Sequence, residues 1–432
     1  MIPFLIKNLL IINGLFFVLV LGPLHVKAAK YEYQLGFDAR YGVHLLGPAD
    51  VATNRHTFEY QQKIGFSKIW SAVLGLRTEV EAAYANNADR YSVGDVAKKD
   101  SQSFFTRDNY LQYKGDILRA RLGYQQVVWG ETFGSYYADI VNPKDFREAG
   151  LGDLSRNRLA TAMMNLQWIG ATTSFQILYI PKATFNLLPS AGSDFNLFKA
   201  TAGIPTNLAI QRDSQNSTSR GEYGVRVTQQ FSGGLDLSAF YLNYYDRMPV
   251  YRLIFGSMPS DITASPDYKL LQTFGTTATF DLRGYLLRAE VLQHANREIN
   301  TQTPAGLSSD SSNELISVFG IDFPGYDKWQ LGVQYSESHL QQGAWLGRDS
   351  TQATAQVRVA KSFVSNILFE ALLTAFTSDS STLAQLDMSL PISSRSEFLV
   401  GLDKFDGTQT SALGRFRDAS RAWVMFKLTL RE

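Results

Sequence analysis

Residues 422–430 read AWVMFKLTL, and this stretch decides the fold class. Every second residue of it is apolar: Ala422, Val424, Phe426, Leu428 and Leu430. Because side chains of a strand alternate between two faces, the pattern predicts a strand with one apolar face. Similar segments of about ten residues recur along the whole chain, and nothing else in the sequence is apolar enough to bury them. We therefore expect these faces to meet lipid, in an all-β protein formed by one transmembrane antiparallel barrel.

The segments with a period of two number about eighteen. They are 31–41, 56–66, 69–84, 104–114, 116–128, 159–168, 171–180, 221–231, 235–246, 269–281, 284–297, 313–322, 327–339, 350–363, 365–377, 382–391, 395–405 and 421–431. Tight connections, such as Ile169-Gly170, alternate with long ones at 42–55, 85–103, 129–158, 181–220 and 247–268. Transmembrane barrels place short turns at the periplasmic rim and long loops outside, which soluble sandwiches and solenoids have no reason to do.

The two faces of the predicted strands differ in chemistry. In the first strand Tyr33 and Phe37 share one face, whereas Asp38 and Arg40 share the other. Repeating this assignment places charged residues in the lumen: Arg77, Glu79, Glu81, Arg119, Arg121, Arg226, Arg288, Glu290 and Arg358. Aromatic residues near the strand ends are expected at the two membrane interfaces: Trp168, Phe231, Trp329 and Phe363 at the turns, with Tyr84, Tyr179 and Tyr245 at the loops. Segments 213–219 and 301–313 are expected to be mobile loop tips.

The N-terminal residues have the pattern of a secretory signal. Lys7 precedes a short apolar run from Leu9 to Leu21, and Val26-Lys27-Ala28 satisfies the small-residue rule for cleavage before Ala29. The alternative is a transmembrane anchor, but this run is shorter than the roughly 20 residues that a span requires. We predict a signal peptide at 1–28, a barrel at 29–432, and a location in the outer membrane of a Gram-negative cell.

Composition argues against several classes of function. The 41 basic and 40 acidic residues provide no overall field for nucleic acid, and zero cysteines exclude thiolate chemistry. The five histidines include no i, i+4 pair, so we expect neither a metal nor another cofactor. His294 and His339 could belong to a barrel hydrolase, a remote alternative, but no nucleophile motif accompanies them. We expect no enzymatic activity.

One segment carries a dense set of motif residues. From Arg121 the chain reads RLGYQQVVWGETFGSYYADIVNPKDFREAGLGDLSRNRLATAMM. This segment resembles an uncharacterised family of proteobacterial outer-membrane barrels with the motifs R-L-G-x-Q-x-V-x-W-G-E and D-x-V-N-P-x-D-x-R-E. The matching positions are Arg121, Leu122, Gly123, Gln125, Val127, Trp129, Gly130, Glu131, Asp139, Val141, Asn142, Pro143, Asp145, Arg147, Glu148, Asp153, Arg156 and Arg158. The chain departs from the family at Ala149-Gly150 and in ending on Glu432 instead of an aromatic residue.

The resemblance implies an outer-membrane barrel that admits a solute, and it names no solute. The residues themselves suggest where selection occurs, because a barrel of about eighteen strands has a wide lumen that something must narrow. We expect the loop 129–158 to fold inward with Asn142-Pro143 as a turn, the alternative being an outward loop held by salt bridges. The candidate pore residues are Arg77, Glu79, Arg119, Arg121, Trp129, Glu131, Asp139, Asn142, Asp145, Arg147, Glu148, Arg156, Arg158, Arg226, Arg288, Glu290 and Arg358.

Two functions of different classes follow. The first is a porin-like channel for passive, selective transport of a small solute, and the second is a barrel that scaffolds, anchors or ensheathes a partner protein. The charged lumen favours the channel, because a sheath requires a plain, wide interior. The expected partners are outer-membrane lipid and lipopolysaccharide, the solute, and the machinery that assembles outer-membrane barrels, with no nucleic acid.

Overall fold

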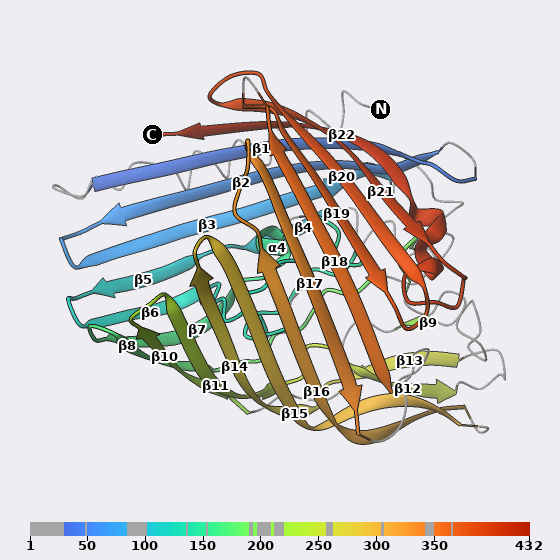
Figure 1. Cartoon of the computed structure of the whole chain (residues 1–432), viewed down its shortest axis with the longest axis horizontal. Helices are drawn as coiled ribbons and strands as arrows, with labels where there is room; N and C mark the ends of the chain where they lie inside the picture. The colour runs from blue at the N-terminus through green and yellow to red at the C-terminus, as the bar shows by residue number, and fades with distance from the viewer. Residues whose placement is uncertain are drawn as a thin grey trace.

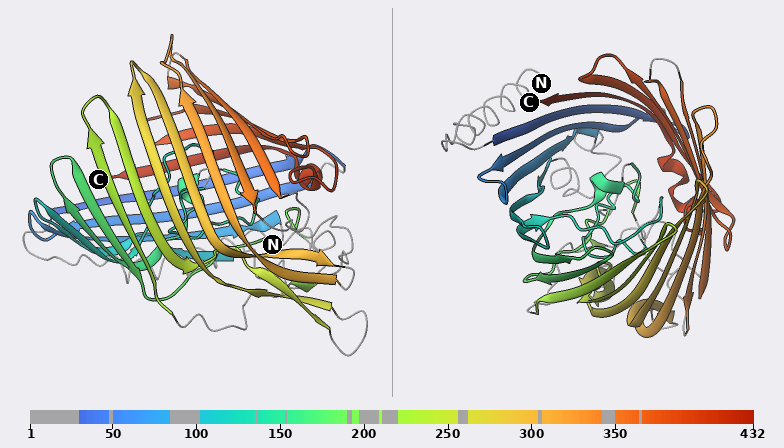
Figure 2. Two further views of the ribbon diagram at one scale, coloured as in Figure 1. Left: turned by 60° about the horizontal axis from the view of Figure 1, so that its bottom comes forward. Right: turned by 60° about the vertical axis from the view of Figure 1, so that its left-hand side comes forward.

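The chain forms a closed antiparallel barrel of 18 strands with a segment of chain inside it (Figures 1 and 2). The computed structural model describes residues 30–47, 50–83, 102–134, 137–152, 154–189, 193–196, 209–210, 220–255, 262–303, 306–341, 350–363 and 366–432. The predicted signal peptide therefore lies outside the described residues.

The wall follows the chain order almost without interruption. Its first half consists of β1 (Lys30–His44), β2 (Val51–Gly65), β3 (Trp70–Glu81), β4 (Gln102–Thr106), β5 (Asn109–Lys114), β6 (Leu118–Gln125), β7 (Thr161–Ile169), β8 (Thr173–Ile180), β10 (Glu222–Phe231) and β11 (Leu235–Tyr245). Its second half consists of β14 (Leu270–Leu282), β15 (Tyr285–Thr303), β16 (Gly306–Asp322), β17 (Trp329–Leu340), β18 (Thr351–Ser362), β19 (Leu368–Phe376), β20 (Ser381–Pro391), β21 (Ser396–Asp406) and β22 (Arg421–Arg431). β4 and β5 both pair with β3 and together occupy one position in the wall.

The barrel closes between its first and last strands. β1 pairs antiparallel with β22 from Gln34 opposite Arg431 to His44 opposite Arg421. Backbone hydrogen bonds between Tyr33 and Glu432 extend the ladder to the last residue, at 2.9 and 3.1 Å. Because this seam is continuous, the described wall has no free strand edge at its junction.

The two ends of the barrel differ, as the sequence predicts. At one end, called the turn end, residues 66–69, 232–234 and 283–284 are examples of the short links between strands. The other end, called the loop end, carries the long connections, although 377–380 forms a short turn there. A separate three-stranded sheet at the loop end contains β9 (Ala209–Ile210), β12 (Val250–Phe255) and β13 (Ile262–Asp267).

Several predicted features differ from the structure, among them the long connection expected at 42–55, since β1 ends at His44 and β2 already begins at Val51. The segment 301–313, expected as a mobile tip, continues the hairpin of β15 and β16, where Ser312 is buried. Tyr245, expected at the membrane interface, is buried against Tyr268 and Ala183 because loop-end residues fold over it. Tyr84 and residues 213–219 lie outside the described residues.

Exposure confirms the assignment of the two faces. Val424 is 38% exposed, whereas its neighbours Trp423 and Met425 are 6% and 8% exposed. Trp168, Phe231, Trp329, Phe363 and Tyr179 are exposed near the strand ends. Within the described residues, no helix combines the length and the apolarity that crossing a membrane requires. The two helices that position the site are short, α4 (Leu154–Asn157) and the 3-10 helix η2 (Gly414–Ala419).

Candidate functional site: the lumen loop

Residues 126–160 leave β6 and return in β7, and between these strands they lie inside the barrel (Figure 2, right). We call this segment the lumen loop. Its first lobe, residues 129–141, contacts the wall between β8 and β18, whereas its second lobe, residues 145–157, contacts β1 to β3 and β22. The loop thus spans the lumen from one side to the other.

Asn142 holds the point where the two lobes meet. Its side-chain oxygen accepts a hydrogen bond from the Val127 nitrogen at 2.7 Å, and its amide donates to the carbonyls of Gln125 and Leu159, both at 2.9 Å. With 1% exposure and all of these bonds made, Asn142 fixes the base of the loop and has no face toward a passing solute. Asn142, which was predicted to form a turn of the inward loop, therefore anchors the base of that loop.

Buried charges surround this base. Arg158 donates to one Asp139 oxygen at 2.9 and 2.6 Å, and the Lys144 ammonium donates to the Asp139 carbonyl at 2.7 Å. Burial lowers the pKa of Lys144 to about 8, although Asp139 opposes that shift. Asp139 and Arg158 are 5% and 7% exposed, so the structure places these two predicted pore residues in the anchor of the loop.

Trp129 is the apolar anchor of the first lobe. The side chain is fully buried, its ring nitrogen donates to Gln176 on β8 at 2.8 Å, and its ring packs on Phe240 of β11 at 5.1 Å. Gly224 of β10 makes room for it, because a Cβ at that position would lie 2.9 Å from the Trp129 ring. An apolar core of residues from β7 to β16, including Leu178 and Leu292, therefore lies inside the barrel beneath the first lobe.

Glu290 binds the first lobe through backbone groups. One of its oxygens accepts from the nitrogens of Glu131 at 2.6 Å and Thr132 at 3.0 Å, and the other accepts from Ala138 at 3.2 Å. Glu131 in turn pairs with Arg226 of β10 at 2.9 Å. A carboxylate that satisfies several backbone donors fixes the course of a segment without regular secondary structure.

Glu148 fixes the second lobe to the opposite wall. Its carboxylate pairs with Arg55 of β2 and with Arg421 of β22, the latter at 2.9 Å, while Arg421 also binds Asp403 of β21 at 2.9 Å. Burial would raise the pKa of Glu148, but Arg421 and Arg55 together hold it well below its usual range. The carboxylate therefore stays ionised and bound.

Arg147 and Arg156 complete the attachment. Arg147 binds Asp145 at 2.6 Å within the lobe and Glu79 of β3 at 3.0 Å, and Arg156 binds Asp38 of β1 at 2.6 Å. Arg77 of β3 donates to the Arg156 carbonyl at 2.8 Å. The structure thus links five predicted residues, namely Arg77, Glu79, Asp145, Arg147 and Arg156, while Glu148 belongs to a neighbouring cluster with Arg55 and Arg421.

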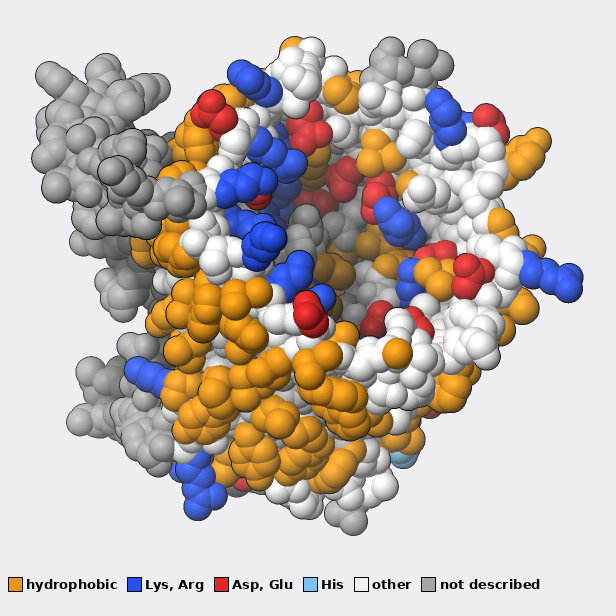
Figure 3. All heavy atoms as spheres, turned by 90° about the vertical axis from the view of Figure 1, so that its left-hand side faces the viewer, with side chains coloured by type: hydrophobic (Ala, Val, Ile, Leu, Met, Phe, Trp, Pro, Cys, Tyr) orange, Lys and Arg blue, Asp and Glu red, His pale blue; other side chains and the backbone are white. Residues whose placement is uncertain are grey.

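A cavity of about 750 Å³ lies beside the second lobe. Its wall side comes from β18 to β22 and from β1 to β3, and its inner side comes from the second lobe with Phe133 and Gly134. Viewed from the turn end, the barrel is hollow, with basic and acidic side chains around the opening (Figure 3). Toward the loop end, Leu151 packs with Leu383, Phe405 and Phe416 in an apolar cluster.

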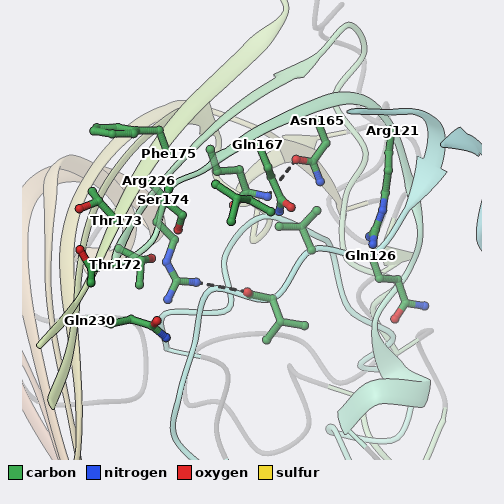
Figure 4. Close-up of a pocket in the computed structure, with 16 residues that line it drawn as sticks. Arg121, Gln126, Asn165, Gln167, Thr172, Thr173, Ser174, Phe175, Arg226 and Gln230 are labelled. Atoms are coloured by element: carbon green, nitrogen blue, oxygen red, sulfur yellow. Dashed lines mark hydrogen bonds between the residues drawn. The ribbon is translucent and has the colours of Figure 1, made fainter. Parts of the chain in front are cut away.

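A second, smaller cavity opens under the first lobe (Figure 4). Arg121, Asn165, Gln167, Gln176 and Arg226 are among its lining residues. The Arg121 guanidinium lies 5.2 Å from the Tyr110 ring. Polar groups thus also line the lumen on the side away from the larger cavity.

The three other predicted residues lie on the wall, apart from the second lobe. Arg358 binds Glu370 of β19 at 2.9 Å and lines the larger cavity, and Arg288 pairs with Asp322 of β16. Arg119 lies on β6 near the turn end.

Sequence reasoning missed Arg55 and Arg421 as partners of the loop, and Asp403 as the wall partner of Arg421. A signal existed for Arg421, because extending the alternation of the last strand back by one residue places it on the lumen face with Trp423. Arg247, also missed, binds both oxygens of Glu222 at 2.7 Å and the Val141 carbonyl at 3.0 Å.

The two histidines considered for a hydrolase lie on opposite faces of the wall. His294 is buried on the lumen side, where its ring nitrogen is 2.6 Å from the Thr273 hydroxyl. His339 follows the alternation of exposed Val333 and Tyr335 and is bonded to Thr351 at 2.8 Å. One site could not use both rings.

The closed 18-stranded wall with a loop inside it defines the architecture of an outer-membrane β-barrel. The chain belongs to the family described as "Protein of unknown function (DUF1302)", whose model matches residues 51–375. No curated protein matches this chain.

Solved structures share the fold at low sequence identity. Acinetobacter baumannii OccAB1 is 8% identical with a TM-score of 0.55, over 94% of this chain and 97% of that one. Pseudomonas aeruginosa OccK9 (OpdG) is 10% identical with a TM-score of 0.53, and OccK8 (OprE) of the same organism is 9% identical with a TM-score of 0.52. Each of these two covers 94% of this chain and 98% of its own.

Proposed function

We propose that this protein is a porin-like channel of the Gram-negative outer membrane, through which a small solute passes passively beside the lumen loop. The observation that carries the proposal is that the second lobe leaves an open cavity along β18 to β22 and β1 to β3. Ionic and apolar side chains share its lining, so passage depends on the chemistry of the solute. The turn end would face the periplasm and the loop end the cell exterior.

The alternative of a sheath or scaffold receives less support. A partner segment inside the barrel would compete for space with the lumen loop, whose lobes are bound to both sides of the wall. The narrowing that a channel requires is supplied by the chain itself, through the second lobe and the apolar cluster around Phe405 and Phe416.

Removal of the second lobe tests the proposal directly. Lys144 and Arg158 already form an antiparallel bridge at the base of this lobe, so a two-glycine link can replace residues 145–157 without moving the first lobe. In planar bilayers, the native protein should form discrete channels, and the shortened protein should form channels of higher conductance. Heat modifiability would verify that both proteins fold into barrels.

A matched control is Arg252→Gln, which removes a charge on the separate sheet outside the lumen and should leave conductance unchanged. If the folded native protein formed no channels and the shortened protein formed none either, the channel proposal would be overturned. Channels of equal conductance in the two proteins would show that the lobe does not narrow the path.

A further inference from the structure

The lumen face carries apolar side chains where a channel for ions alone would have polar ones. Leu372, Leu399 and Met425 lie on the inward faces of their strands and line the larger cavity. Their outward neighbours, such as Leu373 at 46% exposure, face the membrane. Lumen residues of such barrels are ordinarily polar, so this apolar lining requires an explanation.

The register of three neighbouring strands places two of these apolar residues in line with Arg40. Leu399 of β21 lies opposite Met425 of β22, and Met425 lies opposite Arg40 of β1. The three side chains therefore form one row across neighbouring strands on the lumen face. Because adjacent strands are about 4.8 Å apart, Leu399 and Arg40 are separated by roughly 10 Å.

Arg40 is the cation in this cavity that is available to a ligand. Its guanidinium lies 4.3 Å from the centre of the Trp423 ring, and no described carboxylate forms a salt bridge with it. The other lining cations are all paired: Arg55 with Glu148, Arg77 with Glu79, Arg156 with Asp38, Arg358 with Glu370 and Lys427 with Glu397.

The nearby carboxylates do not offer an equivalent site for a cation. Glu148 and Asp403 are both bound to Arg421. Asp387 lines the cavity from β20, but its Oδ1 atom is buried, and a Cβ built on Gly401 would lie 2.7 Å from it. Asp387 forms no salt bridge with a described cation either, but it lies opposite Gly401 in another row of the sheet, so the charge beside Leu399 and Met425 in their row is the positive charge of Arg40.

We propose that the row Leu399, Met425 and Arg40 is a binding subsite for an amphipathic organic monocarboxylate. The carboxylate binds Arg40 at the edge of the Trp423 ring, and the apolar body lies along Met425 and Leu399. This inference rests on the proposed channel function and names the class of its solute.

Three short compounds, which separate the charge from the apolar chain, test the subsite. Hexanoate carries both the charge and the apolar chain, acetate carries the charge alone, and hexanamide carries the chain alone. With the native protein in planar bilayers, hexanoate should block the potassium chloride current reversibly, and acetate and hexanamide should block at least about tenfold more weakly. Hexylamine probes the opposite sign of charge.

Two variants locate the effect. Arg40→Gln should weaken the block by hexanoate about tenfold and leave the weak effect of hexanamide unchanged, whereas Leu399→Asn should weaken both. Arg252→Gln, which lies outside the cavity, should change neither. Arg40→Lys should retain part of the hexanoate effect, because it keeps the charge without the planar stack on Trp423.

The outcomes separate this inference from the channel proposal. Equal block by hexanoate and acetate, stronger block by hexylamine, or an unchanged Arg40→Gln channel would overturn the subsite while the channel stands. If the protein did not conduct, calorimetric titration of hexanoate into the protein in nanodiscs would decide the subsite alone, and equal heats for the native protein and Arg40→Gln would overturn it.

Discussion

Glu148 Oε2 lies 2.9 Å from Arg421 Nη2, although the two residues are 273 positions apart in sequence. The contact joins the tip of the lumen loop to the strand that closes the barrel. Arg55 binds the second oxygen of the same carboxylate from the neighbouring side. One side chain thus ties the lumen loop to two wall strands.

Glu148→Gln should release the second lobe. The substitution removes the charge that both arginines bind, and breaking a buried ion pair by neutralising one partner costs about 3 to 5 kcal/mol. Single-channel recordings should show larger current fluctuations and a higher mean conductance than the native protein. Glu370→Gln, which breaks a pair between two wall strands, should produce no such fluctuations. Matching traces from the two variants would refute a specific role of Glu148.

The contact of Glu148 should be insensitive to mild acid. Its pKa in the folded protein is held below the usual carboxyl value, so the stabilisation is present above the unfolded pKa and is lost only when pH falls through the lower, folded one. Conductance recorded from pH 8 to pH 5 should therefore show no opening transition that depends on Glu148. An opening transition of the native channel within this range, absent from Glu148→Gln, would contradict the assignment.

Arg156 and Asp38 should influence ion selectivity in opposite directions. The pair spans the second lobe and β1, both residues line the cavity, and 29% of the Arg156 side chain is exposed. Arg156→Gln leaves a carboxylate at the path and should shift the reversal potential in a salt gradient toward cations, whereas Asp38→Asn should shift it toward anions. Shifts of the same sign would indicate a general loosening of the loop.

Gly224→Ala should weaken the docking of the first lobe. The added methyl group would lie 2.6 Å from Leu242 Cδ1 and 2.9 Å from the Trp129 ring, which amounts to overpacking worth about 1 to 3 kcal/mol. The unfolding temperature should fall accordingly. Gly320→Ala is the matched control, since its methyl group would be no nearer than 3.6 Å to another residue. An equal loss of stability in both variants would show that the effect comes from replacing any strand glycine and not from the contact with Trp129.

The lipid-facing register can be tested on β22. Val424→Arg places a charge on the outward face and should cost about 2 to 4 kcal/mol near the membrane midplane. Thr429→Lys, on the lumen face of the same strand, should be tolerated. Equal sensitivity of both variants in a urea titration of the folded barrel would show that the two faces are exchanged.

Period-two alternation predicted the wall well, because each strand carries its own evidence for its two faces. The segment 104–114 illustrates the limit, since β4 and β5 are interrupted at Arg107 and Asp108. Asp108 accepts a hydrogen bond from the Gln126 nitrogen and Arg107 binds Glu59, contacts that no local pattern encodes. The extension of β15 and β16 beyond residue 300 likewise depends on Asn300, which binds the backbone of Tyr251.

The sequence predicted which residues take part in the site better than it predicted which wall residues they contact. Charge density drew attention to the segment around Arg147 and Glu148, and alternation placed Arg77, Glu79 and Glu290 on the lumen face. The division into anchoring residues, such as Asn142 and Asp139, and cavity residues, such as Arg156, depends on which wall strand each one reaches. Those distances arise from barrel closure, which brings residues far apart in sequence together.

The seam between β1 and β22 also has a consequence for how the barrel forms. Tyr33 and Glu432 are 399 positions apart, so the seam joins the two strands with the largest sequence separation in the wall. Contacts of this kind carry the highest loop-closure entropy and slow folding. The seam should therefore be the last pairing to form during membrane insertion, and Arg421 would reach Glu148 only then. The contact between Glu148 and Arg421 would therefore be a kinetic marker of complete assembly, whereas the contacts of the second lobe with Asp38 and Glu79 do not depend on the seam.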